Sequence, residues 1–248
     1  RLVATAWRPE AVDDCVSAAP DRVHAGALDV TDGGQVAAAV AAALERFGHI
    51  DVLVNNAGHG FVGAVEEIAL DELRTLMDTM FFGAVALTQA VLPHMRAQGS
   101  GAVVQISSMG GQVSAAGFGA YCAAKFALEG TSEALAAELA PLGIRVLIVE
   151  PGAFRTGFGG GRMQRSKALE AYAETVGPTR EFVDAMDGNQ PGDPAKAAAA
   201  ILTALDAPEP PLRLALGADA VDAIRAKHER LRADLDGWER VARDTALA

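Results

Sequence analysis

Short apolar runs and longer amphipathic stretches alternate along the chain, and this alternation predicts the secondary structure. Runs rich in β-branched residues predict strands at 2–6, 23–28, 50–54, 101–108, 144–149 and 212–216. Apolar residues at helical spacing predict helices just after Pro9 and at 33–47, 71–97, 120–140, 194–205 and 219–243. Strands that alternate with helices build parallel sheets. The expected fold is therefore α/β, a Rossmann-type doubly wound parallel sheet in a single domain spanning 1–248.

The alternation stops after Thr156, where a glycine-rich run at 157–161 begins. A helix-like stretch to about 186 and a turn at 188–194 follow before the regular pattern returns. A long excursion from the carboxyl end of a strand is typical of a segment that covers a binding site. We therefore expect 157–193 to form a mobile substrate lid within the domain.

Composition excludes several classes of partner and of site. The chain has 248 residues and a formal net charge of −11, which argues against nucleic acid or an anionic membrane as partner. No apolar run approaches about 18 residues without polar interruption, and no signal-peptide pattern opens the chain, so a cytoplasmic protein is expected. Cys15 and Cys122 lie in different predicted elements, which predicts no disulfide. The five histidines show no metal-ligand spacing, so no metal is expected.

Ser108, Tyr121 and Lys125 are the candidate catalytic residues. The serine ends a buried apolar strand, and ligands of open parallel sheets bind at that edge. Tyr121 and Lys125 are four residues apart among helix formers, which places the phenol and the ammonium on one helical face. An ammonium ~6 Å away at an effective dielectric of ~20 contributes roughly 3 kcal/mol, or about two pKa units, toward an ionised phenol. Such a tyrosine approaches acid/base strength near neutral pH, although this spacing alone also fits surface or packing residues.

Two further motifs follow predicted strands, and together with the serine and the Tyr-x-x-x-Lys they carry a family resemblance. Asn55-Asn56-Ala57-Gly58 follows the strand at 50–54, and Pro151-Gly152-Ala153-Phe154-Arg155-Thr156 follows the strand at 144–149. In this order the motifs resemble the short-chain dehydrogenase/reductase family, and in particular bacterial members similar to hydroxysteroid and retinol dehydrogenase-like oxidoreductases. The resemblance extends from the first strand to about Leu216.

The resemblance implies an NADP(H)-dependent alcohol dehydrogenase or carbonyl reductase that interconverts a ketone or aldehyde and an alcohol. Ser108 would hydrogen-bond the substrate oxygen, and Tyr121 would exchange a proton with it. Lys125 would lower the pKa of the tyrosine and hold the ribose hydroxyls of the cofactor, while the nicotinamide exchanges the hydride. Family members also pair through the helices expected here at 71–97 and 120–140, which implies a homodimer or homotetramer. The alanine-rich faces of those helices equally fit burial against their own sheet.

Cofactor choice depends on the end of the first strand in this sequence. Arg8 there favours the 2′-phosphate of NADP, with NAD possible if it is only a solvated arginine. Trp7 would stack on adenine or cover the edge of the core. Asp29 and Val30 resemble an adenine-contacting pair, although the aspartate equally fits helix capping. The full expected cofactor set is Arg8, Asp29, Val30, Asn56, Ala57, Gly58, Tyr121, Lys125, Pro151, Gly152, Phe154 and Thr156.

The substrate pocket is expected to be apolar and therefore to suit an apolar small molecule. Its expected lining residues are Met109, Val113, Phe118 and Phe158, with Phe154, His59, Phe61 and Tyr172 as further candidates. Aromatic residues in such loops also occur as core residues, so the pattern leaves both roles open.

Two departures from the family pattern affect this interpretation. The sequence lacks the family's first strand and the glycine-rich turn that cradles the cofactor pyrophosphate. Deleting a central strand would leave its neighbours with unpaired backbone groups, so we expect roughly 25 to 30 further residues upstream.

The second departure is Met80, where relatives commonly have an asparagine that helps hold a water linking the lysine to solvent. A thioether cannot donate that hydrogen bond. Other groups could hold the relay, activity could be reduced, or the chain could be a non-catalytic, redox-sensing dinucleotide-binding protein. A damaged relay predicts that Met80→Asn raises turnover, whereas simple helix packing leaves function intact.

Overall fold

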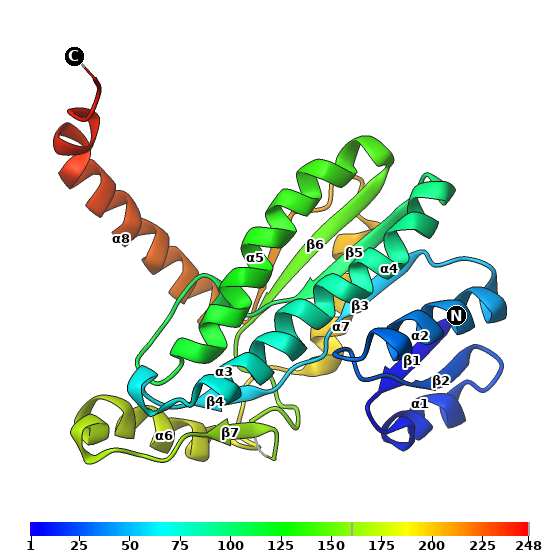
Figure 1. Cartoon of the computed structure of the whole chain (residues 1–248), viewed down its shortest axis with the longest axis horizontal. Helices are drawn as coiled ribbons and strands as arrows, with labels where there is room; N and C mark the ends of the chain where they lie inside the picture. The colour runs from blue at the N-terminus through cyan, green and yellow to red at the C-terminus, as the bar shows by residue number, and fades with distance from the viewer. Residues whose placement is uncertain (160, 248) are drawn as a thin grey trace.

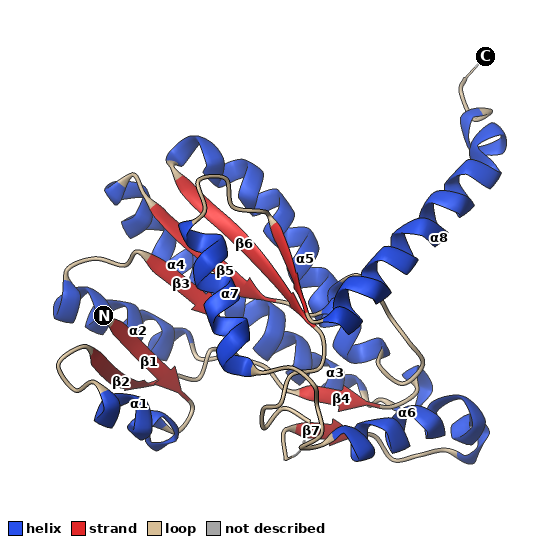
Figure 2. Cartoon of the chain, turned by 180° about the vertical axis from the view of Figure 1, so that it is seen from behind, coloured by secondary structure: helices blue, strands red, loops and turns tan. Residues whose placement is uncertain are grey.

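Four parallel strands form the central sheet, in the order β3 (Val52–Asn55), β5 (Gly101–Ile106), β6 (Ile144–Pro151) and β8 (Arg213–Leu216). The computed structural model describes residues 1–159 and 161–247. Helices α4 (Gly83–Gln98) and α5 (Gly119–Leu139) cover one face of this sheet, and α7 (Pro194–Asp206) covers the other (Figure 1 and Figure 2). These layers confirm the expected α/β Rossmann-type architecture.

A second parallel pair, β1 (Leu2–Ala6) and β2 (Val23–Ala27), lies beside the central sheet without joining it (Figure 2). Within the described residues, β1 pairs only with β2, and β3 pairs only with β5. The apolar side chains of Val52 and Val54 on β3 are 42% and 50% exposed. β1 and β3 therefore each have one edge without a strand partner among the described residues.

Local signals fix the helix ends in the first half of the chain. Asp32 caps α2 (Gly33–Phe47) by accepting hydrogen bonds from the backbone N–H groups of Gly34 and Gln35, and Gly48 ends the helix at a φ of 80°. Two short helical segments, η1 (Pro9–Val12) and α1 (Asp13–Ala18), connect β1 to β2. The main core lies between the sheet and the helices α2 and α4, with buried residues that include Val36, Val40, Leu53, Val91, Val103 and Ile148.

The single helix expected at 71–97 is confirmed as one continuous run, Leu70–Gln98, with a π-helical turn in its middle. It forms α3 (Leu70–Met77), a π-helical turn at Asp78–Phe82 and then α4, which ends at Gly99. The run Leu70–Gln98 is long and apolar enough to cross a membrane by length and composition. Its residues Leu76, Met80 and Met95 are at most 1% exposed, so one face of the run packs in the core of this fold.

Two short strands form a separate sheet that was not predicted from the sequence. β4 (Gly60–Val62) and β7 (Met163–Arg165) pair in parallel and join the start of the 157–193 segment to the region after the Asn-Asn-Ala-Gly turn. The prediction of a helix-like stretch up to about 186 is therefore wrong for its first part, which contains β7. The helix itself is α6 (Ala173–Met186). The last helix, α8 (Ala218–Arg243), leaves the body of the molecule at its far end (Figure 1).

Candidate active site

Ser108 and Tyr121 meet at Gly110, just beyond the carboxyl end of β5. A Cβ atom at Gly110 would lie 3.1 Å from Tyr121 Cε1 and 3.3 Å from Ser108 Oγ, so only glycine leaves both groups in place. The N–H of Gly110 donates to Ser108 Oγ at 2.9 Å, which fixes the hydroxyl. Strand β5 therefore delivers the serine to the first turn of α5, which carries the tyrosine.

Lys125 lies on the same face of α5 as Tyr121, one turn further along. Its Nζ is 5.9 Å from the centroid of the tyrosine ring. The side chain is buried, and Nζ donates to the carbonyl oxygen of Ile106 at 2.7 Å. This bond holds the lysine against the end of β5, next to the serine. The structure thus brings together the three candidate catalytic residues.

The electrostatics of the pair differ from the expectation of a lowered tyrosine pKa. Burial raises the pKa of Tyr121 to about 12, although the hydrogen bond with Ser108 opposes this shift. Burial also lowers the pKa of Lys125 to about 8, against the attraction of the Glu129 carboxylate. Loss of water is therefore the largest influence on the pKa of both groups. A phenol that stays protonated at neutral pH is a proton donor, which suits reduction of a carbonyl.

Phe158 is the expected substrate residue that lies directly at Tyr121. The two rings pack edge to face with centroids 5.7 Å apart. Phe158 and Met163 both crowd Gly60, where a Cβ atom would lie 3.2 Å from Phe158 Cε1 and 2.4 Å from Met163 Sδ. Met163 was not predictable from the sequence, because β7 brings it there by long-range pairing with β4. Met109, Val113 and Phe118 lie half-buried in the connection from β5 to α5.

Three further pocket candidates have other roles. Phe61 is 1% exposed and packs in the core against Leu76 and Met80, so it does not line a pocket mouth. The ring of Phe154 packs into the apolar cluster on the far face of the sheet, while its backbone bridges to Gly192. Tyr172 donates its hydroxyl proton to Glu66. His59 stays half-buried beside the Asn-Asn-Ala-Gly turn, with Nδ1 3.4 Å from the carbonyl oxygen of Gly60.

The expected cofactor residues lie where strands end, with mixed exposure. Arg8, Asn56, Ala57 and Thr156 are exposed, and Gly58, Pro151 and Gly152 are half-buried. Trp7 is 77% exposed, so it does not cover the core edge, and stacking on adenine remains its candidate role. These residues fit the adenosine and nicotinamide ends of a dinucleotide. Within the described residues no glycine-rich turn stands ready for the pyrophosphate between them.

Asp29 and Val30 contribute to local structure at the end of β2. The carboxylate of Asp29 accepts hydrogen bonds from the backbone N–H and the hydroxyl of Thr31, at 2.9 and 2.7 Å. Val30 packs against Gly83 so closely that a Cβ atom there would lie 2.5 Å from Val30 Cγ2. Asp29 therefore holds a local turn, and the helix-capping alternative for it is wrong, because Asp32 caps α2.

Asn55 is a residue whose role the sequence did not reveal. It is buried, and its Nδ2 donates to Thr88 Oγ1 at 2.9 Å and to Gln105 Oε1 at 3.0 Å. These bonds tie β3 to α4 and to β5. The first asparagine of the Asn-Asn-Ala-Gly motif thus holds the scaffold, which leaves the exposed Asn56 for ligand contact.

Met80 lies in the π-helical turn and is only 1% exposed. It packs against the α5 residues Ala120 and Ala124 and the partly buried Tyr121. A Cβ atom at Gly58 would lie 3.2 Å from Met80 Sδ. The side chain therefore fills the space between the Asn-Asn-Ala-Gly turn and the tyrosine helix, which supports the packing interpretation.

We expect Met80→Asn to lower stability without raising turnover. The substitution removes buried apolar contacts and places an amide among them, at a cost of at least about 2 kcal/mol. Denaturant unfolding and kcat of the purified variant measure the two effects. Met80→Leu, which keeps the volume, is the control and should stay near wild-type stability. A higher kcat in Met80→Asn at unchanged stability would instead show that a damaged relay limits the native protein.

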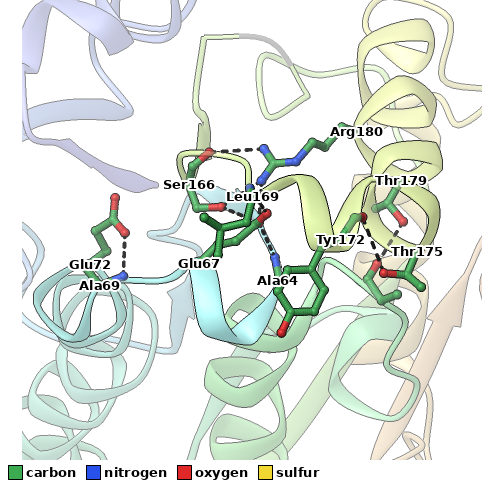
Figure 3. A network of polar contacts seen from close by, with 11 residues as sticks. Ala64, Glu67, Ala69, Glu72, Ser166, Leu169, Tyr172, Thr175, Thr179 and Arg180 are labelled. Atoms are coloured by element: carbon green, nitrogen blue, oxygen red, sulfur yellow. Dashed lines mark hydrogen bonds and ion pairs between the residues drawn. The ribbon is translucent and has the colours of Figure 1, made fainter.

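A buried ion pair fastens the 157–193 segment to the body of the protein (Figure 3). Arg180 on α6 donates to Glu67 Oε2 at 2.7 Å, and the Glu67 side chain is 1% exposed. Glu67 also accepts hydrogen bonds from the backbone N–H groups of Leu169 and Ala64 and from the hydroxyl of Ser166. Burial raises the pKa of Glu67, but these donors outweigh it and bring the pKa to about 2. The distal half of the expected lid is thus anchored.

The fold and the Ser108, Tyr121 and Lys125 cluster define a dinucleotide-binding oxidoreductase. A family model described as short chain dehydrogenase matches residues 1–167, and the chain belongs to this family. It is 40% identical over 242 residues to the oxidoreductase BOA17 of Botryotinia fuckeliana. The alignment covers 97% of this chain and 88% of that protein.

Two other similar proteins extend the comparison. The 3-ketodihydrosphingosine reductase of Bacteroides thetaiotaomicron is 39% identical over 192 residues, covering 77% of this chain and 71% of its own length. The crystal structure of a short-chain dehydrogenase from Streptomyces avermitilis is 56% identical and superposes with a TM-score of 0.93 over 98% of this chain and 90% of that one. The family and the fold expected from the sequence motifs are therefore confirmed.

Proposed function

We propose that this oxidoreductase is a carbonyl reductase that uses NADPH to convert an apolar ketone or aldehyde into an alcohol, and that it also catalyses the reverse reaction. The observation that carries the proposal is the placement of the Tyr121 phenol beside the hydroxyl of Ser108 and one helical turn from the side-chain nitrogen of Lys125. A hydrogen-bond donor and a proton donor next to each other can bind one carbonyl oxygen from two directions.

Each residue has one task in this reaction. Ser108 positions the substrate oxygen, and Tyr121 gives it a proton. A nicotinamide cofactor, when bound, would supply the hydride for the carbonyl carbon. Lys125 returns a proton to the phenolate and can bind the ribose hydroxyls of the cofactor. The ring of Phe158 covers Tyr121 and excludes water from the proton donor.

The preference for NADPH rests on Arg8, which is exposed at the end of β1. A guanidinium there can pair with the 2′-phosphate, and such a charge-assisted contact contributes about 1.5–3 kcal/mol. We expect Arg8→Ala to raise KM for NADPH roughly 10-fold or more while KM for NADH stays unchanged. Steady-state kinetics with both cofactors measure this. An equal loss with NADH, or no loss with either, would contradict a phosphate contact.

An apolar substrate is supported by the residues around Tyr121, which include Phe158 and Met163. The similar 3-ketodihydrosphingosine reductase carries a long-chain ketone in its name, which agrees with this class. We also propose a cytoplasmic homodimer or homotetramer. Phe82 and Phe126 are 55% and 44% exposed on the helices that pair in family members, and light scattering tests the oligomeric state. A monomer at micromolar concentration would contradict it.

The second candidate is a dinucleotide-binding protein with little catalysis, which the buried Met80 favours because the family's asparagine is absent. The deciding assay follows NADPH consumption against a panel of aliphatic, aromatic and steroid-like carbonyl compounds. Turnover on any member that disappears in the Tyr121→Phe variant supports the reductase. Tight NADPH binding without turnover on any member supports the binding protein.

A further inference from the structure

A cluster of charged side chains lies behind Lys125 and has no task in the reaction described above. Glu129 follows Lys125 by one turn on α5, and Glu150 is the penultimate residue of β6, just before Pro151. They are 5% and 1% exposed, so both carboxyl groups are buried. Arg213 faces both, with Nε 3.0 Å from Glu129 Oε2 and 3.6 Å from Glu150 Oε1. We call Glu129 and Glu150 the acid pair.

The acid pair connects to solvent through its neighbours. Gln112 donates its side-chain N–H to Glu150, and its Oε1 lies 2.7 Å from Nε2 of His228 on α8. Arg213 also contacts Glu133 on α5, whose side chain is 64% exposed. The charged and titratable groups that face the acid pair are thus Lys125 and Glu133 from α5, Arg213 from β8 and, through Gln112, His228 from α8.

One side of the acid pair borders Ser107, which is next in the chain to the residue that binds Lys125. Glu129 Oε1 and Ser107 Oγ are buried, and neither has a hydrogen-bond partner within 1–159 and 161–247. A Cβ atom at Gly111 would lie 3.0 Å from that Glu129 oxygen and 2.6 Å from Ser107 Oγ, so both oxygens border one small space. Ser107 directly follows Ile106, whose carbonyl oxygen binds Lys125 Nζ. Buried polar atoms almost always have a hydrogen-bond partner, so we expect these two oxygens to be linked by a hydrogen bond, either directly or through one water.

The buried cluster around Met80 consists of apolar residues in the described part of the chain. Met80 fills the position of the family's asparagine, and its neighbours are the apolar residues Phe61, Leu76, Ala120 and Ala124. An apolar, packed region holds no ordered water. Among the described residues, Ser107 and Glu129 therefore offer buried polar groups along which a proton can reach Lys125.

We propose that the acid pair supplies the proton that Lys125 passes to Tyr121, with Glu129 and Glu150 acting as positioning residues for the carbonyl reduction proposed above. In each cycle the carbonyl carbon gains a hydride from NADPH and the oxygen gains the Tyr121 proton. The phenolate then takes a proton from the Lys125 ammonium, and the resulting amine takes one from the carboxylic acid. The carboxylate regains a proton from solvent at the Gln112 side, so one proton is consumed per carbonyl reduced.

The proton affinities of the groups agree with this direction. Burial and the neighbouring Glu129 raise the pKa of Glu150, against Gln112 and Arg213, to about 7. The pKa is about 8 at Lys125 and about 12 at Tyr121. Each transfer toward the substrate therefore moves the proton to a group of higher affinity, and the carboxyl group titrates near neutral pH, where solvent can reload it.

The test compares the pH dependence of kcat for carbonyl reduction in the wild type, Glu150→Gln and Glu133→Gln. In the wild type kcat should fall as the pH rises through neutrality and the acid pair loses its proton. Glu150→Gln should lose this inflection, and its kcat at pH 6 should fall at least ~10-fold. This loss is smaller than the usual loss for a general acid, because the pair acts through Lys125. KM should stay within about 2-fold of the wild-type value. Glu133→Gln, which changes an exposed carboxylate on the same arginine, should keep the wild-type profile.

A wild-type pH profile and kcat in Glu150→Gln would overturn the proposal. If that variant does not fold, Glu129→Gln takes its place with the same expected loss, and Glu150→Asp should retain the inflection. Absence of carbonyl turnover in the wild type, with NADPH bound, would instead contradict the reductase function, so the two failures are distinguishable.

A stability measurement tests the buried Glu150 without any turnover. Folding raises the pKa of this carboxyl group from its ordinary 4.5 to about 7, so the folded state favours the protonated form. The associated stability is present below pH 4.5 and is lost as the pH rises to about 7. We expect the Tm of the wild type to fall over this range relative to Glu150→Gln. Parallel Tm curves for the two proteins would contradict the buried carboxylic acid on which the relay depends.

Discussion

Tyr121→Phe should lose at least ~100-fold in kcat for carbonyl reduction, because general acid catalysis typically contributes 10² or more. The substitution removes one hydroxyl from a ring whose packing against Phe158 and α5 stays the same. Fold and NADPH binding should therefore be retained, which separates a chemical loss from a structural one. Steady-state kinetics and fluorescence titration of NADPH on the same preparation measure both.

The chain offers a matched control, since it contains only two tyrosines. Tyr172→Phe makes the identical chemical change on the 157–193 segment, where the hydroxyl group donates to Glu66. We expect this variant to keep kcat within about 2-fold, because a partly exposed hydrogen bond contributes about 1 kcal/mol to stability and none to proton transfer. Near-normal turnover in Tyr121→Phe, or equal losses in both variants, would remove the phenol from the mechanism.

Elements with local signals were predictable from the sequence. The helix expected at 33–47 occurs at those residues, because Asp32 caps its start and Gly48 supplies the positive φ at its end. The strand at 2–6 was likewise predictable from its β-branched run. β4 and β7 were not, because each has three residues and forms only through pairing of segments about a hundred positions apart.

In the candidate site, the positions of the catalytic residues were predictable from the sequence, whereas the pKa of Tyr121 and the acid pair were not. The motifs sufficed to place Ser108, Tyr121 and Lys125 together, because strand ends and helical spacing determine their positions. The pKa of Tyr121 was not predictable, since it depends on how much water the packed neighbours exclude. The acid pair was also hidden, because Glu129, Glu150 and Arg213 come from three elements that meet only in the folded protein.

The anchor of the 157–193 segment leads to the second large expected effect. Arg180→Ala should destabilise the protein by about 3 kcal/mol, the low end of the range for removing one partner of a buried ion pair. The low end applies because Arg180 is 18% exposed and Glu67 keeps its bonds to Leu169, Ala64 and Ser166. Denaturant unfolding measures the loss, and hydrogen exchange of residues 163–186 shows whether the segment opens before the rest of the fold.

Arg165→Ala is the matched control for the anchor, because it removes an arginine from the same segment and breaks its contact with Asp184. Those side chains are 37% and 63% exposed, so the loss should stay within about 1 kcal/mol. Equal losses in the two variants would show that the Glu67 pair is no stronger than a surface contact.

The pH dependence of the anchor follows from the depressed pKa of Glu67. Folding lowers that pKa from 4.5 to about 2, so the stability contributed by the ionised carboxylate is present above pH 4.5 and is lost as the pH falls toward 2. Acid should therefore release the 157–193 segment first and expose Phe158, which packs on Tyr121. In Glu67→Gln this acid-dependent step should disappear from exchange at residues 163–186. A step that persists in this variant would assign the acid sensitivity to another carboxyl group.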